Sequence, residues 1–137
     1  MAELIASVEL FKGFSKKDLK LLHAQLKEDW FNAGDDIISA EDEPGRFYIV
    51  TEGRASVVVD GEVVRTLGPG DYFGEMALLD NAPRSATVRA ETQVKTQWLS
   101  RMQFLSLLEE NWSMAKVVLA DLCARIRRYD RAHASLQ

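Results

Sequence analysis

The chain has 137 residues, of which 47% are hydrophobic and 28% charged, as expected of one folded globular domain. Its net charge is −4, which argues against a protein that binds nucleic acid through general electrostatics. Cys123 is the single cysteine, and His23 and His133 are the two histidines, so an intramolecular disulfide and a multi-histidine metal site are excluded. No apolar run approaches the ~20 residues that cross a bilayer, and no signal-peptide pattern is present. We therefore expect a cytoplasmic domain without membrane insertion.

The first element with a clear pattern is a short helix over residues 15–26. Ser15 is a suitable N-cap residue, and Leu19, Leu22 and Leu26 follow it at helical spacing. This pattern predicts a helix that packs its leucines on the core.

From about Glu28 to Leu99 the pattern changes to short strands separated by turns. Asp60-Gly61 between Val59 and Val63 predicts a tight hairpin, because both central turn positions favour a positive φ. The strand segments are rich in β-branched or aromatic residues and span 47–50, 55–59, 63–64, 87–90 and 94–99. Many short strands with regularly spaced turns are typical of a barrel or jelly roll.

After Leu99 the spacing of apolar residues becomes helical, first over 104–108 and then over 112–133. The second stretch carries a heptad stripe that we call the seam: Ala115, Leu119, Leu122, Ile126, Tyr129 and His133. Two interpretations stay open, because the seam can pack on the domain's own β-structure or pair with a second subunit.

The segment most informative about function runs from Asp71 to Ala90. Gly74 lacks a Cβ and allows a ligand to approach the backbone, and the residues after it favour a helical turn whose free N–H groups attract anions. Arg84 can add a bidentate fork to two phosphate oxygens. These residues indicate a phosphate site.

Glu75 does not fit a site for phosphate alone, because a carboxylate repels phosphate. It fits a ligand that also presents a hydroxyl donor, such as a ribose 2′-OH. A ribonucleotide that presents phosphate and sugar together satisfies both groups. The alternative interpretation is an ordinary Glu75–Arg84 salt bridge across a loop.

The sequences Phe73-Gly74-Glu75-Met76-Ala77-Leu78-Leu79 and Pro83-Arg84-Ser85-Ala86-Thr87-Val88 resemble the phosphate-binding cassette of the cyclic nucleotide-binding domain family. The resemblance covers nearly the whole chain. It implies a mainly β fold with flanking helices: an eight-stranded antiparallel β-roll (jelly roll) with N-terminal helices, a short cassette helix and two C-terminal helices. A single domain would span 1–137, with an N-terminal helical segment at 1–27, the β-roll at 28–100, the cassette at 73–87 and the C-terminal helices at 101–137.

The same resemblance implies the roles of individual residues. Glu75 would receive the ribose 2′-OH, Arg84 would pair with the cyclic phosphate, and Leu67 would pack on the purine. The remaining cassette residues of the ligand site, several of them phosphate contacts, would be Phe73, Gly74, Met76, Ala77, Leu78, Ser85 and Ala86. On the last helix, Arg125 would reach towards Glu75 and Tyr129 would cover the base; they are one helical turn apart and share a face.

Family members that favour cGMP often carry threonine after the cassette arginine, so Ser85 favours cAMP while leaving cGMP binding open. The leading hypothesis is a regulatory module, not an enzyme, that needs no prosthetic group. It would bind a cyclic nucleotide and act on an effector through its C-terminal helix, as a monomer or a weak homodimer. The alternatives are a ligand-free β-roll interaction module and, with little support from two histidines, a cupin-type enzyme.

Overall fold

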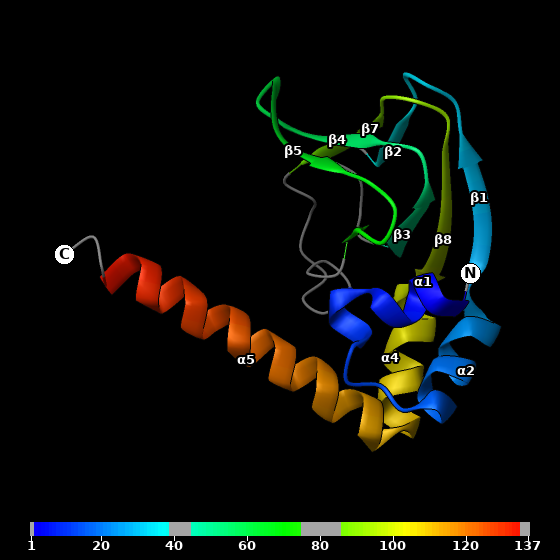
Figure 1. Cartoon of the computed structure of the whole chain (residues 1–137), viewed down its shortest axis with the longest axis vertical. Coiled ribbons are helices and arrows are strands. Elements are labelled where there is room, and N and C mark those ends of the chain that lie inside the picture. Colours follow the sequence, from blue (N-terminus) through cyan, green and yellow to red (C-terminus); the bar gives the residue numbers. More distant parts are fainter. Residues whose placement is uncertain (1, 39–44, 75–85, 135–137) are drawn as a thin grey trace.

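A computed structural model describes residues 2–38, 45–74 and 86–134 of the chain. Its eight strands form two four-stranded antiparallel sheets, ordered β1-β8-β3-β6 and β2-β7-β4-β5 (Figure 1). The strands are β1 (Lys27–Phe31), β2 (Asp36–Ile38), β3 (Arg46–Glu52), β4 (Ala55–Val59), β5 (Glu62–Leu67), β6 (Tyr72–Phe73), β7 (Thr87–Ala90) and β8 (Val94–Ser100).

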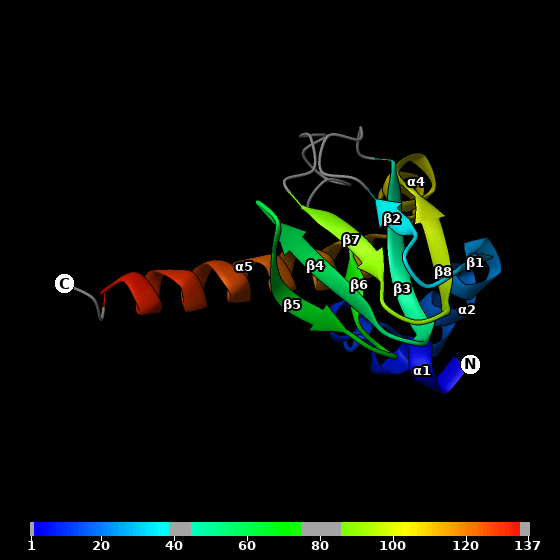
Figure 2. The same cartoon turned by 90° about the horizontal axis from the view of Figure 1, so that it is seen from above.

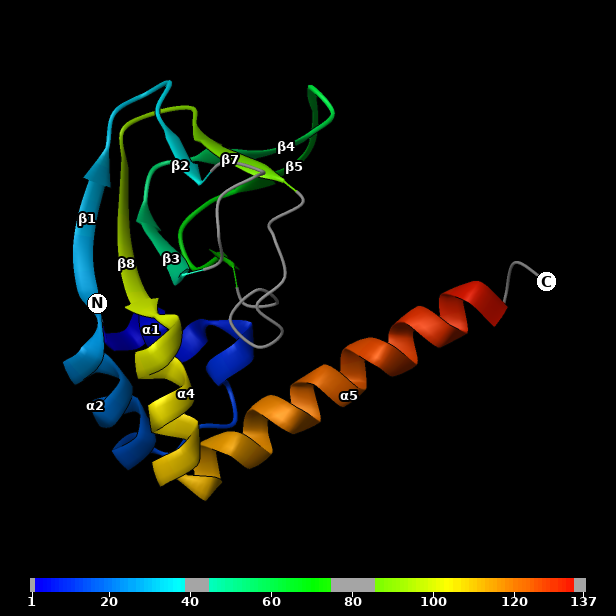
Figure 3. The same cartoon turned by 180° about the vertical axis from the view of Figure 1, so that it is seen from behind.

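Helices lie on both sides of the strands in the sequence, which confirms the predicted mainly β fold with flanking helices. They are α1 (Ala2–Ser7), the 3-10 helix η1 (Glu9–Phe11), α2 (Lys16–Gln25), α4 (Arg101–Glu110) and α5 (Trp112–Ala134). In space, α1, α2 and α4 gather at one end of the roll (Figures 1 and 3). The predicted cassette helix lies outside the described residues.

Local signals in the sequence account for several element ends. The Ser15 hydroxyl accepts a hydrogen bond from the Asp18 backbone N–H at 3.1 Å, which confirms the predicted cap of α2. The predicted hairpin joins β4 to β5, with φ of 51° at Asp60 and 79° at Gly61. Positive φ at both central positions is the geometry of a two-residue hairpin turn.

Strand β3 separates two apolar clusters because its side chains alternate between the two faces of the sheet. Phe47 and Ile49 join the cluster formed with the helices, whereas Tyr48 and Val50 face the cluster inside the roll. All of these side chains are buried. The roll therefore has a filled interior and a helix-covered outer face.

Helix α5 begins against the body of the domain and then runs away from it (Figures 1 and 2). Its main contacts are with α4 and η1, where Met114 and Val118 are 1% and 2% exposed. Of the predicted seam, Leu119 and Ile126 are 52% and 59% exposed. The seam as a whole is therefore not the face that packs on this chain, and the main neighbours of α5 are the helices α4 and η1. Within the described ranges, no helix is both long and apolar enough to cross a membrane.

Candidate functional site

The cassette segment is held at its two ends by strands from different sheets. Strand β6 pairs with β3 in one sheet, and β7 lies between β2 and β4 in the other. Residues 75–85 fall outside the described part of the chain, and so do six of the predicted site residues: Glu75, Met76, Ala77, Leu78, Arg84 and Ser85. The described flanks of this segment are β6 with the turn before it, and β7.

A tight turn before β6 fixes where the cassette begins. The Asp71 carboxylate accepts a hydrogen bond from the Gly68 backbone N–H at 2.8 Å. The backbone of the same turn exchanges two hydrogen bonds with Val50, donated by the Gly70 N–H and by the Val50 N–H, each at 2.9 Å. Gly70 has a φ of +92°, a conformation that favours glycine. These contacts tie the start of β6 to the buried strand β3.

The structure brings two predicted site residues together inside the roll. Leu67 at the end of β5 and Phe73 at the end of β6 are 1% and 5% exposed and belong to one apolar cluster. The Phe73 ring stacks on Tyr48 with a centroid distance of 5.0 Å. Gly74 follows with a φ of +92°, so this position requires glycine for its backbone as well as for ligand approach. The residues that lead into the cassette are thus buried and apolar.

At the other end, Ala86 is partly buried and leads directly into β7. Arg89 on β7 forms an ion pair with Asp36 on β2, with its Nε 2.8 Å from the carboxylate oxygen. Strand β7 is also paired with β4, where Val58 lies opposite Thr87. The exit from the cassette is therefore held from both sides.

A polar cluster that the sequence did not predict lies just after the C-terminal end of β7. The Glu91 carboxylate accepts hydrogen bonds from the Ser56 hydroxyl and from the Arg54 guanidinium. Both hydrogen bonds lower the pKa of the Glu91 carboxyl group, and the one from Ser56 has the larger effect. Next to them Gly53 has a φ of +89°, and a Cβ there would lie 2.1 Å from the Gln93 carbonyl oxygen. The turn at Gly53 therefore requires glycine, because the Gln93 backbone lies against it.

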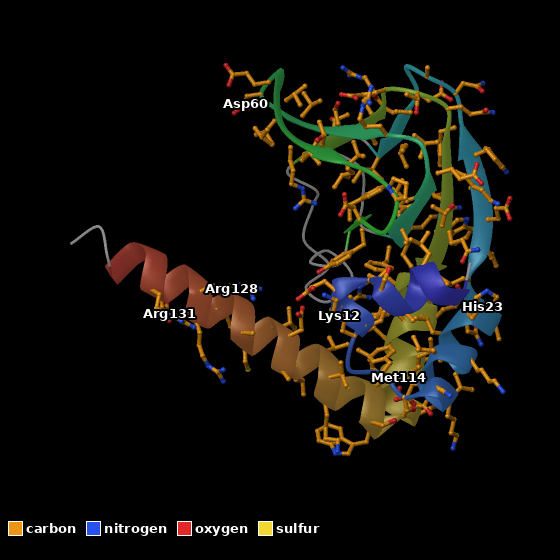
Figure 4. The ribbon with its side chains drawn as sticks, in the orientation of Figure 1. Lys12, His23, Asp60, Met114, Arg128 and Arg131 are labelled. Atoms are coloured by element: carbon orange, nitrogen blue, oxygen red, sulfur yellow. The ribbon has the colours of Figure 1, made fainter. Side chains whose placement is uncertain are left out.

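The two predicted lid residues, Arg125 and Tyr129, lie on α5, and their side chains are outside the described part of the structure. Figure 4 shows the neighbouring Arg128 on the portion of α5 that runs away from the domain. In this conformation that portion of the helix does not cover the roll. Among the described residues, no group of three or more His, Cys, Asp or Glu side chains could hold a metal ion.

These observations define a class of protein. Two antiparallel sheets enclose an apolar interior, and the consecutive strands β6 and β7 belong to different sheets, with Gly74 directly after β6. This is the architecture of a jelly-roll domain. The family profile described as "Cyclic nucleotide-binding domain" matches residues 28–111. The chain belongs to the cyclic nucleotide-binding domain family.

Curated relatives share this sequence over part of their length. A cAMP-dependent protein kinase regulatory subunit of Eremothecium gossypii is 39% identical over 107 residues, which make up 77% of this chain and 23% of the relative. A cGMP-dependent protein kinase of Plasmodium berghei is 32% identical over 128 residues, 93% of this chain and 14% of the relative. The chain therefore spans a quarter or less of the length of these two relatives.

Solved structures share the fold over nearly the whole chain. The N-terminal domain of a transcriptional regulator from Streptomyces coelicolor A3(2) superposes with a TM-score of 0.86 at 27% identity, covering 95% of this chain and 94% of that one. A structure described as cAMP-bound PfPKA-R superposes with a TM-score of 0.80 at 29% identity, covering 98% of this chain and 45% of that one.

Proposed function

We propose that this chain is a regulatory module that binds cAMP in preference to cGMP and signals by repositioning α5. The observation that carries the proposal is the intact cassette sequence, with Glu75 and Arg84, between two strands that are fixed on opposite sheets. A cAMP-bound structure among the similar folds supports the ligand class.

The chemistry of the two cassette side chains explains why both are needed. Arg84 would neutralise the cyclic phosphate through two parallel hydrogen bonds, while Glu75 would accept a hydrogen bond from the ribose 2′-OH. The purine would then face the roll, where Leu67 closes the apolar interior. The backbone groups of Ala77, Leu78 and Ala86 and the Ser85 hydroxyl would complete the phosphate contacts. Each group of the ligand would thus meet a side chain or backbone group of matching chemistry.

The base preference is proposed from Ser85, which stands where family members that favour cGMP often have threonine. Serine keeps a hydroxyl, so we expect cGMP to bind more weakly than cAMP rather than not at all. Titration of the parent chain and of Ser85→Thr with both nucleotides tests this preference. The substitution should narrow the gap between the two affinities; an unchanged gap would contradict the assignment.

Signalling through α5 is proposed from the unequal attachment of this helix. Its first turns are held by Met114 and Val118, and the Ser113 hydroxyl donates a hydrogen bond to the buried Asp18 carboxylate at 2.9 Å. Further along, Leu119 and Ile126 are exposed. A helix anchored at one end can swing at the other, and a ligand that Arg125 and Tyr129 contact only in the closed position would shift that equilibrium.

The same proposal covers partners and setting. An effector domain or protein would be contacted through α5, with no enzymatic activity in this chain, no prosthetic group and no direct binding of nucleic acid. We propose a single domain over 1–137, a cytoplasmic location, which the lone Cys123 supports, and a monomer or weak homodimer.

One observation favours a second candidate, a β-roll that serves as an interaction module without a nucleotide. Among the described residues, the apolar side chains of the roll interior pack on one another in one buried cluster. The intact Glu75 and Arg84 speak against this candidate, because such a module has no physical need for both.

Calorimetric titration of the whole chain with cAMP separates the two candidates. Saturable 1:1 binding supports the cyclic nucleotide module, and heat indistinguishable from dilution would leave the interaction module. Adenosine is the matched control ligand, since it keeps the base and ribose but lacks the phosphate that Arg84 would hold. It should bind far more weakly.

A further inference from the structure

An apolar groove lies between α1 and α2, among the helices at the end of the roll. It has a volume of about 370 Å³ and is lined by Ile5, Lys16, Leu19, Lys20, His23 and Ala24. Figure 4 places His23 on α2, on the side of the domain away from α5. A volume of several hundred Å³ is the size of a pocket for a small organic ligand.

The shape of the groove follows from the helical spacing of α2. Residues 16, 19, 20, 23 and 24 recur at the three- and four-residue intervals that place side chains on one face of a helix. Across from them, Ile5 of α1 is 1% exposed and forms the floor with the half-buried Leu19. Ala24 leaves space where a larger side chain would fill the groove. The floor is thus apolar carbon.

The rim of the groove is basic, although the chain as a whole has a net charge of −4. Lys16, Lys20 and His23 are exposed. Within the part of the chain that the structure describes, none of the three forms an ion pair, whereas Lys12 pairs with Glu9 and Lys95 with Glu28. The aliphatic stems of the lysines extend the apolar wall while their ammonium groups stay at the water boundary. The rim therefore favours an anion.

We propose that the α1–α2 groove binds a small amphipathic anion, an apolar carbon body that carries one carboxylate. The carbon body lies on Ile5, Leu19 and Ala24, and the carboxylate meets Lys16 and Lys20. Burial of apolar surface supplies the affinity, and the charge pairing supplies the orientation. This site does not share a residue with the proposed nucleotide site.

The test uses the whole ¹⁵N-labelled chain and decanoate, followed by amide chemical shifts. We expect saturable shifts at Leu19, Lys20 and Ala24, and binding of decan-1-ol and of decyltrimethylammonium at least about fivefold weaker, because neither carries a negative charge. Equal binding of decan-1-ol and decanoate would overturn the charge assignment. Shifts confined to α5 would overturn the site.

Variants localise the effect. Lys16→Gln combined with Lys20→Gln keeps the stems and removes the charges, and should weaken decanoate binding by roughly tenfold. Lys17→Gln, on the same helix but outside the lining, is the matched control and should change binding by less than about twofold. Ala24→Phe fills the groove from an exposed position and should abolish binding. If Lys17→Gln weakens binding as much as the double variant, the attraction is general and the proposal fails.

Two further experiments distinguish this groove from the proposed nucleotide site and from a membrane-binding surface. Saturating cAMP should leave the affinity for decanoate unchanged within about twofold, so failure of nucleotide binding and failure of this site are read independently. Sedimentation with vesicles that contain phosphatidylglycerol should leave the chain in the supernatant. Vesicle binding that disappears in the double lysine variant would assign the groove to a membrane surface and overturn the small ligand.

Discussion

Strand β3 and helix α5 differ strongly in how much of each is buried in the domain. β3 has five consecutive buried residues, Phe47 to Thr51, because apolar clusters cover both of its faces. α5 has 23 residues, and beyond Val118 the described part of the helix shows exposed or half-buried side chains. The two regions are therefore stabilised by different interactions. The roll is held by apolar neighbours on two sides, whereas most of α5 is held by its own backbone hydrogen bonds.

Under the proposed function, this difference suits the two regions to separate tasks. A stiff roll holds the flanks of the cassette in place, with Phe73 stacked on Tyr48 and Arg89 paired with Asp36. A helix that is anchored at one end can occupy more than one position at small cost. Ligand binding would draw on the first property, and signalling on the second.

The largest expected effect tests the comparison itself. Phe47→Ala removes a fully buried ring that contacts Phe11, Tyr72 and Phe104, and should lower the free energy of unfolding by about 3–5 kcal/mol. Ile126→Ala on α5 should change it by less than ~0.5 kcal/mol. Guanidinium denaturation measures both. Equal losses would mean that α5 packs on the body in solution.

The next largest effect concerns the affinity of the proposed nucleotide site in the roll. Arg84→Ala should weaken cAMP binding by about 2–4 kcal/mol, roughly 30- to 1000-fold, because a fork to a charged phosphate is lost. Arg84→Lys should recover part of the loss, since an ammonium group makes a single charged contact. Calorimetric titration measures it, with Arg131→Ala on the exposed end of α5 as the matched control. An Arg84→Ala affinity within threefold of the parent would refute the assignment.

Glu75 should have a smaller effect that depends on the sugar. The 2′-deoxy analogue of cAMP should bind the parent chain about 1–3 kcal/mol more weakly, because it leaves the carboxylate unpaired beside the phosphate. In Glu75→Ala the gap between the ribo and deoxy ligands should shrink. Competition titration with both ligands measures the gap. A variant that discriminates as sharply as the parent would show that Glu75 has another role.

The exposed seam on α5 tests whether this helix has a partner outside the chain. We expect a monomer, because Arg125 and Arg128 flank the seam and would face their copies in a parallel pair, and about three heptads are marginal alone. Sedimentation velocity with and without cAMP measures the state. Leu122→Asp and Ile126→Asp should leave it unchanged; Ile126 is the cleaner position, since Leu122 also packs on the core. A dimer that both variants dissociate would make the seam an interface.

The smallest expected effect concerns the hydrogen bonds of Glu91 with Ser56 and Arg54. Hydrogen bonds from Ser56 and Arg54 lower the pKa of Glu91 in the folded state. Its stabilising contribution is therefore present at neutral pH and lost as the pH falls through the lowered folded pKa. The stability gap between the parent and Glu91→Gln should be open at pH 7 and close in acid. Thermal unfolding across this range measures it, with Glu62→Gln on the exposed strand β5 as the control. A gap independent of pH would contradict this role.

The sequence alone determined the features that depend on a few adjacent residues. The hairpin at Asp60-Gly61 and the cap at Ser15 follow from φ preferences and from a hydroxyl three residues before an N–H. The cassette motif from Gly74 to Ala86 was recognisable because its chemistry is concentrated in one short stretch. Such signals survive in any fold, since the interacting groups are already neighbours in the chain.

Only the tertiary structure decided which groups from distant positions meet. The seam left open whether α5 packs on the β-structure or pairs with a second subunit; within this chain the packed face is set by where η1 and α4 lie, and it centres on Met114 and Val118. Glu91 finds Ser56 and Arg54 because β4 and β7 pair, and Lys16, Leu19 and Lys20 line a groove because α1 lies opposite α2. Periodicity determines that a helix has an apolar stripe, whereas the position of its neighbours determines which residues are removed from water.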